Sequence, residues 1–125
     1  MAPRTKYVTL PERTIQELTL SKRVEQLMQA HDATIRRISG QYANVWYLEV
    51  VAVHPSLQGR GLGGEAMKCV LEWAKGDPMV LECTEHSNVG FYEKLGFECV
   101  EEVVLVDSSA NTVEECRMWV MLRVP

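Results

Sequence analysis

The chain has 125 residues, a length that predicts one domain with a real hydrophobic core. Its composition, 46% hydrophobic and 24% charged residues, is that of a soluble globular protein, and its net charge of −4 argues against a nucleic-acid partner. No apolar run is long enough to cross a membrane and the N-terminus lacks a hydrophobic signal stretch, so we expect a cytoplasmic or nuclear protein without a membrane partner.

The first 40 residues predict one short strand and one helix. Residues 5–10, "TKYVTL", favour the strand, and Pro11 suits the first turn of the helix that follows. Apolar residues then recur at helical spacing, with charges between them, as far as Gly40. This pattern indicates a long or broken amphipathic helix that faces the core.

Residues 45–53, "VWYLEVVAV", are β-branched or aromatic almost throughout. Such a run is typical of a strand buried on both faces, so we expect it at the centre of a sheet. A glycine-rich loop, a helix over 63–76 and a second strand over 79–84 follow. The strand–helix–strand order implies a right-handed parallel crossover. The buried stripe of the helix is expected to be Met67, Val70, Leu71 and Ala74.

The C-terminal third predicts a short helix and a hairpin. The helix begins near Ser87 or Asn88, both good capping residues, and ends at Gly96. Runs 97–106 and 116–124 are joined by a polar loop, which favours an antiparallel pair. The predicted fold class is therefore α/β (α+β), with a mixed sheet that is parallel at its centre and antiparallel at its C-terminal end. The tryptophans are interpreted as core side chains: Trp46, Trp73 and Trp119.

The cysteines are widely spaced and form no C-x-x-C pair. Neither a zinc site nor a redox pair is supported by this spacing, so we expect no bound metal. Buried thiols in a reducing compartment are the simpler interpretation. The residues concerned are Cys69, Cys83, Cys99 and Cys116.

The loop "QGRGLGG", residues 58–64, holds four glycines in seven residues. Each glycine costs conformational entropy on folding, so this density predicts that something approaches the backbone closely. A P-loop is excluded, because Gly64 is followed by Glu65 and Ala66 instead of lysine and a hydroxyl residue.

A dinucleotide fingerprint is a second interpretation of the loop. G-x-G-x-x-G is present at Gly59, Gly61 and Gly64, and Glu82 lies near the expected ribose-binding position. Two features count against it: residues 54–58 separate the loop from the strand, and too little chain follows for the further βαβ units that such a fold needs.

Anion binding is the third interpretation. A glycine-rich turn that enters a helix leaves successive backbone amides unpaired, and the helix dipole favours phosphate there. Gly61 and Gly63 can present amides without a Cβ atom, and Arg60 can add a positive charge. This interpretation predicts a pyrophosphate ligand, with the preceding strand beside the rest of the molecule.

Two motifs carry a family resemblance. Gln58-x-x-Gly61-x-Gly63, preceded by "LEVVAVHPSL", resembles the acetyl-CoA signature of the GNAT superfamily of N-acetyltransferases. The segment "NVGFYEKLGF", residues 88–97, resembles the second motif of that family. The resemblance covers about residues 45–123. It implies a GNAT-like fold that is shortened on the N-terminal side, since the residues before Trp46 hold at most one short strand and a helix.

The resemblance implies that acetyl-CoA is the co-substrate and that its acetyl group is transferred to a primary amine by direct attack through a tetrahedral intermediate. Runs 45–53 and 79–84 would form the splayed parallel pair of strands, and the backbone of Val51, Ala52 and Val53 would follow the pantetheine arm. Asn88 would hydrogen-bond the same arm. The pyrophosphate would be held by Gln58, Gly59, Arg60, Gly61, Leu62, Gly63 and Gly64.

Tyr92 would lie near the sulfur and protonate the departing thiolate, as the family resemblance implies. The alternative is that Tyr92 is an amphipathic packing residue on a short helix. A binding module that holds CoA without turnover, acting through a partner chain, is the other functional interpretation of the whole chain.

The reaction needs a neutral amine, so a carboxylate or an ordered water should remove a proton. Glu49 is the best candidate, because it is an acid in the most apolar strand and burial would raise its pKa. The alternative is a Glu paired with a cation or lying in solvent. Glu82 and Glu85 are alternatives for contact with the amine. His54 and His86 are interpreted as incidental loop residues.

The acceptor is expected to be a small-molecule or peptide amine whose identity the sequence does not reveal. One side of the strand over 45–53 is expected to lack a partner within the chain, and such edges associate readily. A homodimer or a partner chain is therefore predicted to cover this edge.

Overall fold

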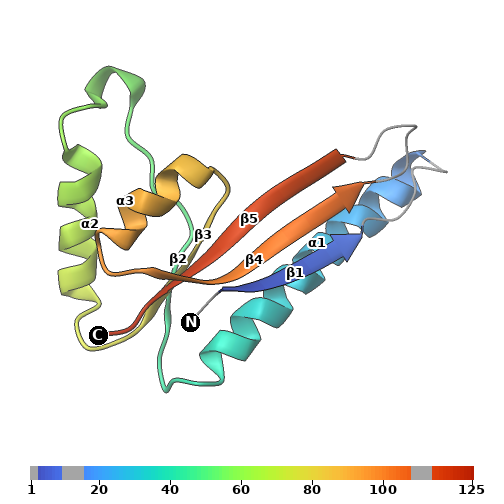
Figure 1. The fold of residues 1–125 in the computed structure, drawn as a ribbon, viewed down its shortest axis with the longest axis horizontal. Helices are drawn as coiled ribbons and strands as arrows, with labels where there is room; N and C mark the ends of the chain where they lie inside the picture. The colour runs from blue at the N-terminus through green and yellow to red at the C-terminus, as the bar shows by residue number, and fades with distance from the viewer. Residues whose placement is uncertain (1–2, 10–15, 108–113) are drawn as a thin grey trace.

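The computed structural model describes residues 3–9, 16–107 and 114–125 (Figure 1). Five strands form one mixed sheet in the order β1-β4-β5-β3-β2, which confirms the predicted fold class. The strands are β1 (Arg4–Thr9), β2 (Trp46–Leu48), β3 (Met79–Cys83), β4 (Glu98–Asp107) and β5 (Glu114–Arg123). The helices are α1 (Gln16–Ser39), α2 (Leu62–Trp73) and α3 (Val89–Glu93), with 3₁₀ turns η1 (Pro55–Leu57) and η2 (His86–Asn88).

The parallel strand pairs lie at the two edges of the sheet. β4 and β3 each pair antiparallel with β5, whereas β1 pairs parallel with β4 and β2 pairs parallel with β3. The prediction of a parallel centre was therefore wrong. The reason is that β5 lies between β3 and β4. The long antiparallel hairpin of β4 and β5 forms the centre of the sheet, and the parallel pairs lie on either side of it.

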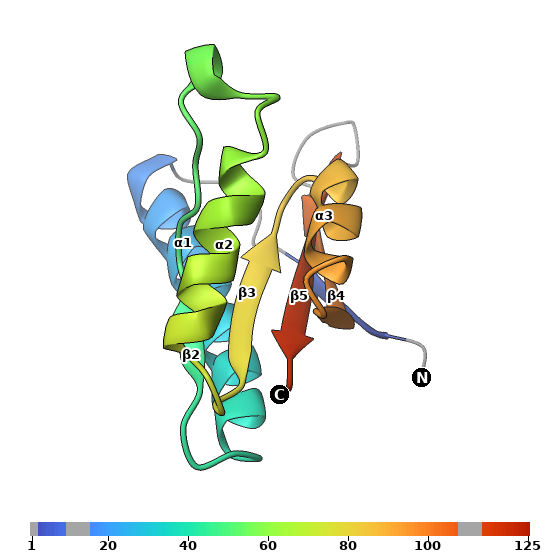
Figure 2. The same cartoon turned by 90° about the vertical axis from the view of Figure 1, so that its left-hand side faces the viewer.

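The helices cover opposite faces of the sheet (Figure 2). α1 packs on one face through Ile35 and Ile38, against side chains that include Val80, Val103 and Val120. α2 and α3 cover the other face, around a second cluster. The 24 residues of α1 span roughly 36 Å at about 1.5 Å per residue, enough to carry the chain from the β1 edge back to the β2 edge. The buried side chains of the second cluster are Met67, Ala74, Met79, Leu81, Cys83, Val89, Phe97 and Met121.

The strand predicted over 45–53 is much shorter and lies at an edge. Residues 46–48 form β2, which lies at the end of the strand order and pairs with β3. Val50 is 76% exposed, so burial on both faces was wrong. With β5 in the centre, no strand within the described part of the chain flanks β2 on its outer side. Whether another chain covers that side stays a prediction.

Two tryptophans predicted as core are at the surface. Trp73 is 85% exposed and Trp46 is also exposed, and their rings lie 6.5 Å apart. Trp73 points away from the sheet because the buried stripe of α2 is set by Met67 and Ala74, with Val70 and Leu71 partly buried as predicted. Trp119 is half-buried against the α2–α3 core.

The remaining elements follow the sequence predictions closely. α1 ends at Ser39, just before Gly40, and β4 and β5 form the predicted antiparallel hairpin. Gly96, which ends the short helix, has a φ of 92°. Pro11 and the centre of the polar hairpin loop lie outside the described residues. No helix in the part of the chain that is described is long and apolar enough to span a membrane.

The cysteine prediction held only in part. Cys83 is buried and Cys99 is half-buried, but Cys69 on α2 and Cys116 on β5 are exposed. All four are free thiols. Cys69 lies off the predicted buried stripe of α2, and Cys116 lies on an exposed position of β5.

Candidate active site

A cavity opens where the two parallel strands of the β2 edge separate. They pair from Trp46 opposite Met79 to Leu48 opposite Leu81. Beyond that point β3 continues against β5, whereas residues 49–53 leave the sheet without strand pairing. This divergence confirms the predicted splay of the two segments.

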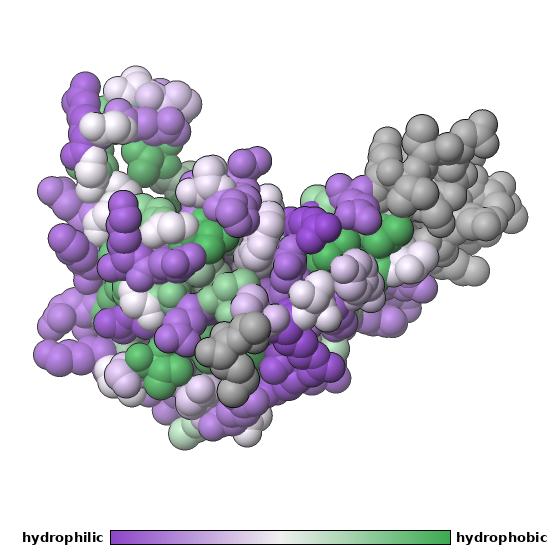
Figure 3. Space-filling view, in the orientation of Figure 1, coloured by the Kyte–Doolittle hydropathy of each residue, from purple (hydrophilic) through white to green (hydrophobic). Residues whose placement is uncertain are grey.

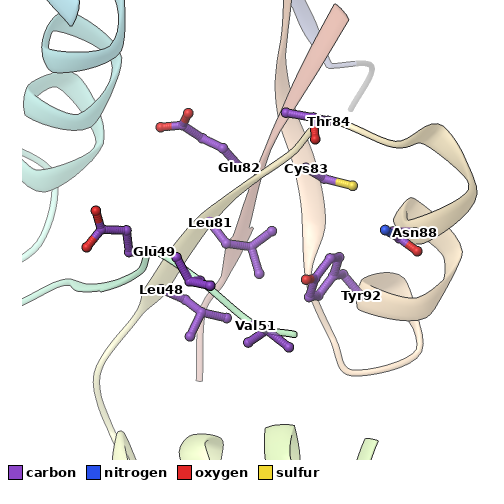
Figure 4. A pocket seen from close by; sticks show the side chains of 10 residues that line it. Leu48, Glu49, Val51, Leu81, Glu82, Cys83, Thr84, Asn88 and Tyr92 are labelled. Atoms are coloured by element: carbon purple, nitrogen blue, oxygen red, sulfur yellow. The ribbon is translucent and has the colours of Figure 1, made fainter. Parts of the chain in front are cut away.

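The cavity has a volume of about 210 Å³. Sites that enclose a whole drug-sized ligand measure roughly 300–1,000 Å³, so this one is suited to the reactive end of a longer molecule. Figure 4 shows Tyr92 and Asn88 on the α3 side and Glu49 and Glu82 on the opposite side, toward α1. The lining residues are Leu48, Glu49, Val50, Val51, Leu81, Glu82, Cys83, Thr84, Asn88 and Tyr92.

The glycine loop presents unpaired amides at the start of α2. Gly61 is the N-cap with φ of 75°, a left-handed conformation that favours glycine. The first helical bond runs from the amide of Glu65 to the carbonyl of Gly61 at 3.1 Å. The amides of residues 62–64 therefore have no acceptor within the helix, and the helix dipole adds positive potential there. This end of α2 can bind an anion.

The loop also packs against both sides of the cleft. A Cβ atom on Gly63 would lie 3.5 Å from Val53 and 3.8 Å from Phe91 of α3, whereas one on Gly64 would meet nothing within 4 Å. The surroundings of Gly64 are thus open to a ligand, and Gly63 lies where segment 49–53 and α3 approach one another. In Figure 3 the segment that carries η1 and this loop stands out from the body of the molecule at the upper left.

Two polar side chains of the loop have internal partners. Gln58 donates from Nε2 to the carbonyl of Val53 at 3.1 Å. That carbonyl therefore already accepts one hydrogen bond within the loop. His54 accepts from the amide of Ser56 at 3.2 Å and caps η1. Both contacts brace the loop.

Tyr92 and Asn88 form the α3 side of the cavity. The Tyr92 ring packs edge-on against Phe91 and Phe97, with centroids 5.1 Å and 5.9 Å away. Burial, and to a lesser extent the nearby Cys83 thiol, raise the pKa of Tyr92 above its ordinary value. The hydroxyl thus stays protonated near neutral pH and can donate. Asn88 is the N-cap of α3, but its side chain makes no capping hydrogen bond and is exposed at the cavity.

Glu49 lies at the cavity, but it is exposed, so the predicted burial was wrong. The reason is the early end of β2. Glu49 comes one residue after the last position of the ladder, and no strand of residues 3–9, 16–107 or 114–125 flanks it on the outer side. Glu82 is the more enclosed carboxylate, with its side chain 14% exposed. Its Oε1 atom is in contact with Nδ1 of His31 in α1.

His31 is the residue of this region that the sequence patterns did not identify. A signal existed, because His31 lies three and four residues before Thr34 and Ile35 on the buried face of α1. A histidine on an apolar stripe indicates a polar partner, but the partner is far away in the sequence.

Glu85 and His86 do not line the cavity. The Glu85 carbonyl accepts from the Cys83 thiol at 3.0 Å, and the His86 ring packs edge-on against Trp119 at 5.1 Å. Both have local roles in the turn before α3. Within the described residues, no group of three or more His, Cys, Asp or Glu side chains could hold a metal ion.

Comparison with models of known protein families matches residues 28–97 to the family described as "Acetyltransferase (GNAT) family". The match covers more than half of the 125-residue chain. It includes both sides of the cavity, the glycine loop and α3.

Proposed function

The chain belongs to the GNAT family of acetyltransferases, and from this membership we propose that it transfers the acetyl group of acetyl-CoA to a primary amine. One observation carries the proposal. A helix start with unpaired amides and a cavity that contains the Tyr92 hydroxyl lie at the same pair of splayed strands. A long ligand with phosphates in its middle and a reactive group at its end suits that arrangement.

The residues present fit acetyl-CoA. The free amides of residues 62–64, with exposed Arg60 beside them, suit the pyrophosphate. Segment 49–53 is outside the ladder, so most of its backbone groups are free to pair with the pantetheine arm as with an added strand. Asn88, which has no capping role, would bind the same arm. Acetyl-CoA supplies the thioester that the reaction consumes.

In the proposed reaction the amine nitrogen attacks the thioester carbonyl directly. A carbon–nitrogen bond forms, a tetrahedral intermediate follows, and its collapse breaks the carbon–sulfur bond. Tyr92 donates its hydroxyl proton to the departing sulfur. Glu49, directly or through a water, accepts the proton that the nitrogen loses, and its place at the cavity supports this role. The products are an N-acetylated amine and free CoA.

The test has two parts. Calorimetry with CoA and acetyl-CoA should detect binding, and thermal stability should rise with the ratio of ligand concentration to Kd. A panel of alkylamines, diamines and short peptides with free amino groups is then screened for release of free thiol from acetyl-CoA. Binding with no thiol release for any amine would indicate a CoA-binding module without turnover. No binding at millimolar CoA would contradict both functions.

A further inference from the structure

The contact between His31 and Glu82 joins α1 to β3 at the wall of the cavity. His31 is in the middle of α1 and is half-buried. Glu82 lies one residue past the point where β2 and β3 separate. Its side chain is on the α1 face of the sheet, opposite the α2–α3 core (Figure 4). The helix therefore reaches the cavity from the side away from the glycine loop.

Tyr47 of β2 braces the same carboxylate. Its hydroxyl donates to Glu82 Oε1 in a long hydrogen bond of 3.5 Å, and its ring packs edge-on against the His31 ring at 5.5 Å. Burial, followed by the charges of Glu82 and Glu49, raises the pKa of Tyr47 to about 12. Tyr47 thus stays a donor at every physiological pH. Both His31 and Tyr47 contact Oε1, which leaves Oε2 for another donor.

The charge at the cavity favours a cationic ligand. Glu49 and Glu82 both line it, and none of the described residues that line it is a lysine or an arginine. A primary amine reaches an enzyme at neutral pH mainly as an ammonium ion, with three N–H donors. A carboxylate whose position is fixed is well suited to receive one of them.

We propose that Glu82, held by His31 and Tyr47, binds the ammonium group of the acceptor, and that α1 thereby forms the acceptor side of the site. His31 and Tyr47 are positioning residues in this arrangement. The site selects amines that arrive as cations. Glu82 orients the nitrogen, and Glu49 takes a first proton and releases it to water, so that the neutral amine can attack. Glu49 then takes the second proton that the nitrogen loses in the tetrahedral intermediate, and that proton returns through water to Tyr92. The inference rests on the proposed function.

A purely structural role for His31 and Glu82 makes a different prediction. In that case the pair only anchors α1 on the sheet, as Arg37 and Glu101 do farther along the same helix. Neither residue of that second pair lines the cavity. Arg37→Gln is therefore a matched control, because it weakens a helix-to-sheet contact of the same kind at a distance from the site.

The experiment measures binding alone and needs no identified acceptor. Two probes carry an ammonium group just beyond the sulfur: S-(2-aminoethyl)-CoA and S-(3-aminopropyl)-CoA. Their uncharged counterparts are S-propyl-CoA and S-butyl-CoA. Kd is measured by calorimetry for the parent protein, Glu82→Gln, His31→Gln and Arg37→Gln, and thermal unfolding checks that each variant is folded.

We expect the parent to bind at least one ammonium probe about tenfold more tightly than its counterpart, as a charge-assisted hydrogen bond of roughly 1.5 kcal/mol allows. Glu82→Gln should abolish the preference, His31→Gln should reduce it, and Arg37→Gln should keep it. Affinity for the alkyl probes should stay within about twofold in all four proteins, because the pyrophosphate contacts are unchanged.

The possible failures point to different conclusions. If no probe binds the parent, the proposed function itself is contradicted. If alkyl and ammonium probes bind the parent equally, or if Glu82→Gln retains the preference, the assignment of Glu82 is overturned. If Arg37→Gln loses the preference as fully as His31→Gln, then His31 acts only by anchoring α1 and its positioning role is rejected.

Discussion

The two edges of the sheet are both parallel strand pairs, but they end differently. β1 pairs with β4 along its whole length, from Arg4 opposite Glu101 to Thr9 opposite Val106. β2 pairs with β3 only as far as Leu48 opposite Leu81, and the segments then separate. At the first edge the strand stays in its ladder to its end, so the backbone groups that face β4 are paired within the fold. The second leaves backbone groups unused, and those groups are what a ligand strand can pair with.

The side-chain contacts of α1 with the sheet show the same contrast. The β1–β4 pair, which stays paired to its end, is the closed edge. Here Arg37 contacts Glu101, whose side chain is 2% exposed, so this contact belongs to the core. The β2–β3 pair, which separates at the cavity, is the open edge. Here His31 contacts Glu82, whose carboxylate remains partly accessible beside the cavity. One helix therefore stabilises the sheet at one position and reaches the candidate active site at another.

The strongest way to test the open edge is to remove its anion site. Gly61→Val places a β-branched residue at φ 75°, where the N-cap conformation and the amides that follow both depend on glycine. We expect CoA binding to fall by more than about 100-fold, as several charge-assisted hydrogen bonds are lost together. Calorimetry with CoA measures the effect.

Gly76→Val is the control for that variant. Gly76 follows the other end of α2 with φ of 90° and has open space around its Cβ position, as Gly61 does. Both variants should lose about 1–2 kcal/mol of stability from the strained backbone, but only Gly61→Val should lose CoA. Equal CoA affinity in the two variants would contradict the pyrophosphate assignment.

Tyr92→Phe tests the chemistry at the open edge. The ring contacts with Phe91 and Phe97 remain, so fold and CoA affinity should change little. Loss of the proton donor should slow acetyl transfer by ~10²–10⁴-fold. The rate is measured in single turnovers, with Tyr42→Phe as control because Tyr42 packs on the opposite face of the sheet. If Tyr92→Phe turns over at the parent rate when the chemical step is rate-limiting, then Tyr92 is only a packing residue.

Arg37→Ala tests the closed edge, where stability and not binding should change. The substitution leaves the buried Glu101 carboxylate without its partner. We expect the free energy of unfolding to fall by about 2 kcal/mol. This is less than the ~3–5 kcal/mol lost when a fully buried pair is broken, because Arg37 is 37% exposed. Urea unfolding gives the free energy. A clear drop in CoA affinity would show that the two edges are coupled.

The smallest effect is expected at alkaline pH and comes from Tyr47 at the open edge. Its pKa in the folded protein, about 12, exceeds the ordinary value of 10.0. The unfolded chain therefore releases this proton first, so the stabilisation is complete below pH 10 and is lost as the pH rises toward 12. The free energy of unfolding of Tyr47→Phe should therefore decrease less steeply with pH in this window than that of the parent protein. Identical slopes for the two proteins would contradict the assigned environment of Tyr47.

Features that depend on residues close together in the chain follow from the amino-acid pattern. The run from Met67 to Ala74 predicts the inward face of α2, and the glycines at 59–64 predict a helix start with free amides. The motif that contains Asn88 and Tyr92 predicts a short helix beside the cleft. Each of these features follows from helix periodicity, capping or turn geometry, which operate over a few residues.

The place of each element in the sheet depends on long-range packing, which the local pattern does not contain. An apolar run such as 45–53 suits a strand buried on both faces, and it equally suits one that ends at a cleft, because local pattern does not include the neighbours. Insertion of β5 between β3 and β4 put β2 at the edge and left Glu49 exposed. The contact between His31 and Glu82 exists because α1 crosses the sheet. The place of His31 on the buried face of α1 indicates a polar partner, but it does not identify one so distant in the chain.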